Sequence, residues 1–286
     1  MKNLFLTILL ATGTSLFSQT AEDLKFVTTV PEAENHWVVL QKDPKNSFYN
    51  VGFIYFDEQA GYSLRSAGTL EEEQGKLKYK EDPNSKTAMY TTRIGNLEYK
   101  SAIISPELLK SFNLPEQPEW LKFYNTSASE NDKILNRASV MNGAGAVKWA
   151  LPKLEKLYQN NFKTGKLYFE LAFAYNALGD FPNAEKICME AMKNKFSDDL
   201  INKEYVFALL QQKKVSEADL FLAKKIDTYK DKSYKYEAVM NTIAIAAQTK
   251  NIDVANKWLE ILKNFNDPKN AENIKKLEEL IVKNNS

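Results

Sequence analysis

The sequence has 286 residues, of which 44% are hydrophobic and 12% are aromatic. This composition can fill the core of one large or two ordinary domains, and it excludes an intrinsically disordered chain. Residues 19–130 carry 12 Lys and Arg against 17 Asp and Glu, and residues 131–286 carry 25 against 20. The basic surplus of the second half is too thin to indicate nucleic-acid binding.

Residues 1–18 have the layout of a secretory signal peptide: a lysine, an apolar run from Leu4 to Ala11, and then small and polar residues. The run is too short to cross a bilayer, which takes about 20 apolar residues, and no later segment approaches that length. A single cysteine, Cys188, excludes an intramolecular disulfide. We therefore expect cleavage near Ser18 and a bacterial periplasmic or secreted protein without a transmembrane segment.

The first half of the chain has the period-two pattern of β-strands. Apolar and polar residues alternate in 77–80 and 97–103, whereas 36–41 and 51–57 are more uniformly apolar, as in strands covered on both faces. Gly, Pro, Asp and Asn between these runs mark turns. The pattern predicts a small antiparallel meander of five or six strands within residues 19–113.

A helix signal ends the β-rich region. Ser105 is placed to cap a helix, Pro106 suits its first position, and Glu107 suits its first turn. Residues 114–130 contain two prolines and a polar run, and we expect them to connect two domains.

A period of 34 residues organises the second half. It relates Gly145 to Gly179 and Lys213, Ala150 to Ala184 and Ala218, and Phe162 to Phe196. Such a period indicates an array of helical hairpins that bury their apolar faces on one another. The predicted units are 131–164, 165–198, 199–232 and 236–269, followed by an amphipathic capping helix over 271–284.

Two features interrupt the regular period. The fourth unit lies about three residues out of register, and we assign the extra residues to the loop at 228–233. Pro152 falls inside the second helix of the first unit, so it should kink that helix or mark its true start.

One unit has a recognisable signature in residues 168–192: Tyr168, Leu171, Ala172, Tyr175, Gly179, Phe181, Ala184, Cys188 and Ala191. These residues resemble the signature of the tetratricopeptide repeat family. The two alanines allow antiparallel helices to approach closely, and Gly179 supplies the turn between them. The predicted fold is thus an α+β protein of two domains, a small antiparallel β-rich domain and an all-α array like tetratricopeptide repeats with a C-terminal capping helix.

The resemblance also implies a binding surface. In this family the first helix of each unit lines a concave face, and the usual contact positions correspond here to Phe169, Phe173, Asn176, Lys203, Phe207 and Gln211. Three phenylalanines form a large apolar patch for an open surface. A partner peptide could cover them, the first half or its linker could fold over them through residues 120–124, or the rings could pack on one another.

No catalytic or metal-binding constellation can be assembled. His36 is the single histidine and has no nucleophile motif to partner it, and Cys188 falls at a packing position. Residues 142–145 lack the lysine of a phosphate loop and more simply end a helix, and residues 71–73 lack the spacing of a calcium loop and suit a solvated hairpin tip. We therefore expect neither enzyme activity nor a cofactor or metal.

Two functions from different classes remain open. The first is an exported interaction or scaffold protein that binds a peptide or protein through the concave face of the array. The second is a carbohydrate-binding or hydrolytic β-rich domain, with the repeats as its structural support. The partner and the oligomeric state are not encoded in any pattern of the sequence.

Overall fold

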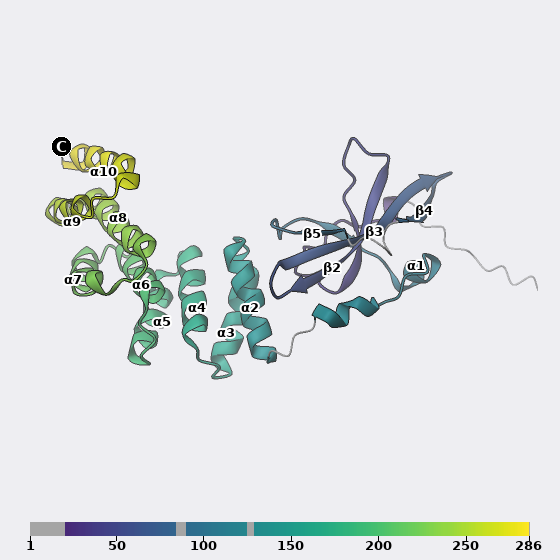
Figure 1. Cartoon of the computed structure of the whole chain (residues 1–286), viewed down its shortest axis with the longest axis horizontal. Helices are drawn as coiled ribbons and strands as arrows, with labels where there is room; N and C mark the ends of the chain where they lie inside the picture. The colour runs from purple at the N-terminus through teal and green to yellow at the C-terminus, as the bar shows by residue number, and fades with distance from the viewer. Residues whose placement is uncertain (1–20, 84–89, 125–128, 286) are drawn as a thin grey trace, which may run out of the picture. The chain divides into compact units, whose positions relative to one another are not determined.

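The computed structural model describes residues 21–83, 90–124 and 129–285. They form two compact units that divide after Tyr124, and each unit is described by itself (Figure 1). The predicted signal peptide, residues 1–18, lies outside the described residues, as do residues 125–128 of the predicted linker.

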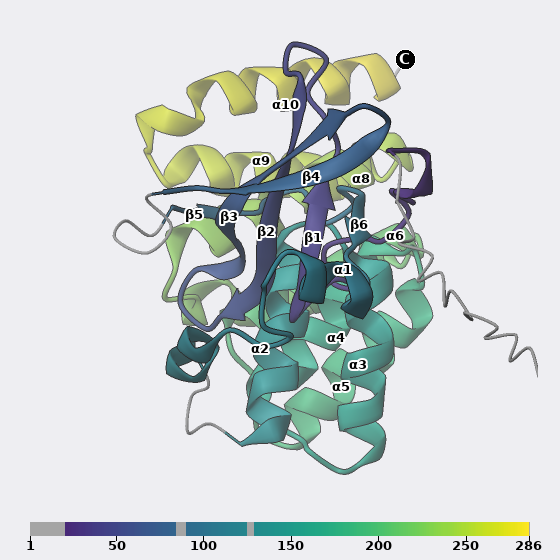
Figure 2. The ribbon, with the colours of Figure 1, turned by 90° about the vertical axis from the view of Figure 1, so that its right-hand side faces the viewer.

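The first unit is built on a six-stranded antiparallel sheet that curves into a half-barrel (Figure 2). Its strand order is β4-β3-β2-β1-β6, and β5 pairs with β3. The strands are β1 (His36–Leu40), β2 (Phe48–Asp57), β3 (Gly61–Glu73), β4 (Lys76–Glu81), β5 (Thr91–Arg93) and β6 (Ser101–Ile103). The predicted antiparallel β-rich region is therefore confirmed.

The sheet differs from the predicted strands at three places, and the first is β5, which no pattern of the sequence indicated. The strand β3 has 13 residues and no alternating pattern, so a period of two did not predict it. Its length is set by its pairing with β2, β4 and β5. Only Ser101–Ile103 of the expected strand 97–103 pairs in the sheet. The alternation of apolar and polar residues does not predict where these strands begin and end, since the extent of a strand depends on its neighbours.

Two glycines allow the long β2–β3 hairpin to bend. A Cβ atom on Gly68 would lie 2.2 Å from the Lys80 carbonyl oxygen, and one on Gly52 would lie 2.8 Å from that of Arg65. The pairing register shifts between Val51 and Gly52, as at a β-bulge. Because only glycine permits such close backbone approach, these positions set the curvature of the sheet.

The segment after the sheet packs on it. The helix α1 (Pro106–Ser111) is capped by Ser105, whose hydroxyl accepts from the Leu108 amide at 3.4 Å, as predicted. The 3-10 helix η2 (Glu119–Tyr124) places Trp120 against Phe53 and Tyr55, with ring centroids 5.6 and 5.1 Å apart. Within the expected linker, Trp120, Leu121 and Tyr124 are therefore packed against the core of the first unit, whereas Phe123 is exposed.

The second unit is a run of antiparallel helix pairs in chain order (Figure 1). The helices are α2 (Glu130–Gly143), α3 (Val147–Gln159), α4 (Gly165–Ala177), α5 (Phe181–Lys193), α6 (Asp199–Gln211), α7 (Val215–Lys225), α8 (Lys232–Gln248), α9 (Ile252–Asn264) and α10 (Ala271–Asn285). The first helices of the pairs contact one another in the series α2, α4, α6, α8, and each second helix contacts the first helix of the next pair. The last helix, α10, packs on α8 and α9 and buries Leu277 and Ile281, as a capping helix does.

Small residues and left-handed turns repeat along this unit. Each helix from α2 to α9 has at least one alanine with no exposed surface, among them Ala138, Ala150, Ala172, Ala184, Ala208, Ala218, Ala246 and Ala255. The turns inside the pairs place Gly145, Gly179, Lys213 and Lys250 at φ of 74°, 79°, 60° and 61°. The turn is thus kept where lysine has replaced glycine, at a conformational cost of about 1 kcal/mol.

The structure locates both irregular features of the array, Pro152 and the extra residues of the fourth unit. Pro152 lies exposed within α3, and the helix begins at Val147, so the proline does not mark its start. The helix α8 has 17 residues where α6 has 13. The extra residues expected in the loop at 228–233 therefore lengthen a helix by about one turn.

We predict that Ala184→Leu lowers the free energy of unfolding of the array by about 1–3 kcal/mol, because the added carbons must force apart helices that meet at a fully buried Cβ. Chemical denaturation of the full chain, followed by circular dichroism at the helical band, measures the change. Ala223→Leu, at an exposed position of α7, is the matched control and should leave the midpoint unchanged. Equal midpoints for both variants would contradict this packing.

Candidate functional site

The candidate site lies on one side of α4 and α6. Positions 166, 169, 173 and 177 of α4 follow helical spacing and share one side of that helix, and positions 200, 203, 207 and 211 of α6 repeat them 34 residues later. Five of the six predicted contact residues remain partly exposed there: Phe169, Phe173, Lys203, Phe207 and Gln211. We call these five residues the first-helix face.

The phenylalanines of the first-helix face rest on neighbouring rings. Phe169 and Phe173 lie with their centroids 6.2 Å apart on successive turns of α4. Phe207 meets the edge of Phe181, the first residue of α5, at 6.2 Å. Each ring is thus held in place by an aromatic contact while part of it stays in contact with solvent.

Asn176, the sixth predicted contact residue, is 7% exposed and is engaged inside the array. Its Nδ2 donates to the backbone oxygen of Glu204 at 3.1 Å and to the Oε2 of that residue at 2.8 Å. Asn142 makes the same two bonds to Glu170, at 3.1 and 2.8 Å, one unit earlier. A repeated Asn–Glu hydrogen bond therefore joins α2 to α4 and α4 to α6.

The glutamates of these pairs were not predicted from the sequence. Glu170 and Glu204 are 5% and 4% exposed, and a buried carboxylate is costly unless donors satisfy it. The Ser139 hydroxyl supplies a further donor to Glu170 at 2.5 Å. The available signal was the same period of 34, which relates Asn142 to Asn176 and Glu170 to Glu204.

Lys203 extends this polar network towards α8. Its ammonium lies 2.7 Å from Glu204 Oε1 and 3.1 Å from Glu237 Oε1, and its side chain is 12% exposed. Burial by itself would lower the pKa of Lys203, but the attraction of the two carboxylates outweighs it and the pKa is raised. Lys203 is therefore charged, and two carboxylates already neutralise it.

The residues set aside as non-catalytic have ordinary surroundings. Cys188 is fully buried, and burial raises the pKa of its thiol, so it carries no reactive thiolate. His36 is exposed, with Nδ1 2.8 Å from the Glu34 carbonyl oxygen. Residues 142–143 end α2, and Glu71 and Glu73, next to the β3–β4 turn, form ion pairs with Lys80 and Lys78.

The described part of the chain shows neither a metal-binding cluster nor a membrane-spanning helix. Within it, no cluster of three or more His, Cys, Asp or Glu residues could hold a metal ion. None of the described helices combines the length and the apolar character needed to cross a bilayer.

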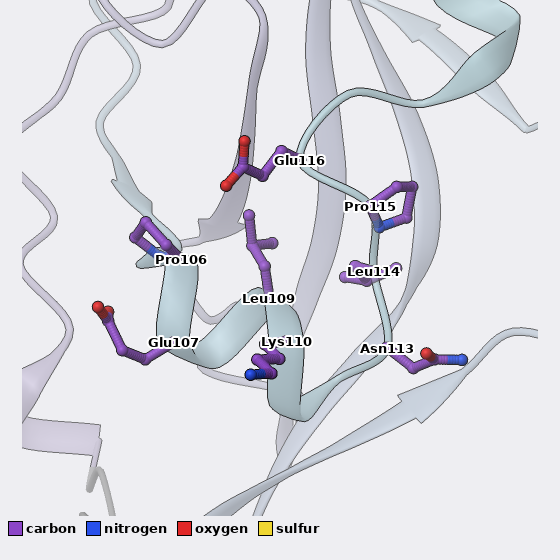
Figure 3. Close-up of a pocket in the computed structure, with 8 residues that line it drawn as sticks. All are labelled: Pro106, Glu107, Leu109, Lys110, Asn113, Leu114, Pro115 and Glu116. Atoms are coloured by element: carbon purple, nitrogen blue, oxygen red, sulfur yellow. The ribbon is translucent and has the colours of Figure 1, made fainter.

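A hollow of about 630 Å³ lies beside α1 in the first unit. Figure 3 shows that Glu107 and Lys110 reach it from the helix and Glu116 from the segment that follows. The three charged groups point to different sides and do not converge on one point. This hollow therefore lacks the paired acid and base that hydrolysis would need.

Comparisons with known proteins do not assign the chain to a class. No protein-family model matches it, and a search of curated proteins finds no match.

Proposed function

We propose that the protein is an exported, non-enzymatic interaction protein that binds a peptide or protein segment on the first-helix face of an array resembling tetratricopeptide repeats. The observation that carries the proposal is the partial exposure of Phe169, Phe173 and Phe207 at repeated positions of two contacting helices. Most other large apolar side chains of α4 and α6 are buried. Retained aromatic exposure at regular spacing is typical of a binding surface.

Within this proposal the six predicted residues divide into two groups. Phe169, Phe173 and Phe207 would anchor apolar side chains of the partner, and the amide of Gln211 would bond to its backbone. Asn176, bonded to Glu204, would hold α4 against α6, and Lys203, paired with Glu237, would hold α6 against α8. The partner expected from this chemistry is an extended or helical segment with apolar side chains at regular spacing.

Peptides selected by display against the full chain test the proposal. We expect Phe173→Ala and Phe207→Ala each to weaken binding of the selected peptides about tenfold or more, since truncating an aromatic anchor costs about 2 kcal/mol or more and about 1.4 kcal/mol is a factor of ten. Met189→Ala, at a side chain that is 53% exposed on α5, is the control and should bind as the parent protein does.

Calorimetry distinguishes a variant that has lost binding contacts from one that has lost its folded structure. Thermal unfolding of each variant shows whether a loss of affinity merely follows a loss of structure. Selected peptides that bind the phenylalanine variants and the parent protein equally well would overturn the assignment of the first-helix face.

We also propose export, on the basis of the lysine and apolar run of residues 1–18. Expression with its own N-terminus in a Gram-negative host should give a mature protein that begins near Gln19, read from its intact mass. A cytosolic product that retains residues 1–18 would contradict export.

A further inference from the structure

A hollow of about 180 Å³ lies between α2 and α3, the first helix pair of the second unit. We call it the α2–α3 hollow, and its lining consists of Asn131 and Ile134 from α2 and of Lys153, Lys156, Leu157 and Asn160 from α3 and its C-terminal cap. Positions 153, 156 and 160 follow helical spacing and share one side of α3. The lining thus combines two ammonium groups, two side-chain amides and two apolar side chains, and it includes no carboxylate.

The protein does not neutralise the two lysines of the α2–α3 hollow. Lys153 and Lys156 are both exposed, and in the part of the chain that the structure describes neither forms an ion pair or a side-chain hydrogen bond. They lie three residues apart on one helix, where like charges repel each other. Lys163, in the turn that follows α3, differs in that its ammonium lies 2.7 Å from a carboxylate oxygen of Glu190. The α2–α3 hollow therefore has a local surplus of positive charge.

The acidic residues next to these lining residues in the chain do not offset that surplus. They do not line the α2–α3 hollow, and each has a partner of its own: Glu130 with Lys133, Asp132 with Ser129 and Glu155 with Tyr175, at 2.8, 2.5 and 2.8 Å. Residues 125–128, which precede α2 and lie outside the described residues, contain no acidic side chain. An anion that enters the hollow thus meets two cations and no carboxylate in the lining.

The donors of the α2–α3 hollow suit a phosphate group better than a carboxylate. An ammonium is a compact point charge that commonly binds phosphate, whereas the planar fork of arginine is the better match for a carboxylate. A phosphate monoester carries nearly two negative charges at neutral pH and three strong acceptor oxygens. The amides of Asn131 and Asn160 make no hydrogen bond among the described residues, so their N–H groups remain available to those oxygens.

We propose that the α2–α3 hollow binds a phosphate group between the ammonium groups of Lys153 and Lys156. The amides of Asn131 and Asn160 would donate to its remaining oxygens. Because both lysines and Asn160 are exposed, a ligand reaches them without any displacement of the helix pair. The site shares no residue with the first-helix face, so the failure of one proposal leaves the other unaffected.

Calorimetric titration of the full chain with methyl phosphate, in a buffer free of phosphate, tests the site. We expect one saturable site, and binding at least tenfold weaker for acetate and for the uncharged trimethyl phosphate. Lowering the pH from about 8 to about 5 should weaken methyl phosphate several-fold, since protonation removes its second charge. Sulfate stays a dianion over this range, so its binding should not change.

Substitutions identify the groups that carry the affinity. Lys153→Gln and Lys156→Gln should each reduce the affinity for methyl phosphate at least tenfold, because each removes one of the two cations from the lining. Lys275→Gln, at an exposed lysine of α10, is the matched control and should leave the affinity unchanged. Since all three side chains are exposed, the melting temperatures of the variants should equal that of the parent protein.

Two sources could supply the phosphate group, a small soluble phosphate or a lipid headgroup. Co-sedimentation with vesicles of phosphatidylcholine that contain phosphatidic acid separates them: retention that methyl phosphate reverses indicates a headgroup, and binding of methyl phosphate without retention indicates a soluble ligand. The proposal would be overturned by any of three results: no saturable binding of methyl phosphate, equal binding of acetate, or full affinity in either variant of Lys153 and Lys156.

Discussion

Close approach of antiparallel helices at fully buried alanines is the constraint on which the second unit depends. Ala150, Ala184 and Ala218 recur at intervals of 34 residues, and none has exposed surface. A side chain that ends at Cβ lets backbones approach to the short end of the usual separation, about 8 Å between axes. The first helices then come near enough for Asn176 to reach Glu204, a bond that a wider spacing would break.

The polar network adds directionality to this packing. Apolar contacts tolerate small slips along a helix, whereas a buried carboxylate loses its donors when the helices slip. Because Glu170 and Glu204 are satisfied by asparagines of the preceding first helix, each joint between units has one preferred register. The same register places Phe173 of α4 and Phe207 of α6 at equivalent positions of neighbouring helices, so the helix packing also positions the proposed site.

Much of this architecture could be predicted from local signals. The cap at Ser105, the small residues and the 34-residue period are local or strictly repeated, and they led to the helix pairs and the capping helix. The period places Lys213 at the position of Gly179, and the structure gives it the same left-handed conformation, although lysine by itself gives no local signal for one. The strand β3 and the lengthened α8 could not be predicted in this way, because neighbouring strands and helices decide where they begin and end.

The candidate sites likewise contain residues that a local signal indicates and residues that only the fold brings together. Asn176 lies at a position that resembles a contact residue, yet a partner 28 residues away in the chain makes it part of the frame. The pocket of about 310 Å³ in the first unit gave no signal in the sequence, since it gathers side chains from β1, β3, β4 and the segment around η2. Chemistry assembled from distant segments is visible only once those segments are folded.

Site-specific crosslinking tests the central claim, that the first-helix face is the binding surface, most directly. A photoreactive phenylalanine analogue would replace Phe169 or Phe207 in the full chain, and Met189 on α5 would serve as the reference position. The account predicts that a peptide selected on the parent protein crosslinks at 169 and 207 and not at 189. Crosslinking at 189 alone, or at equal yield from all three positions, would contradict it.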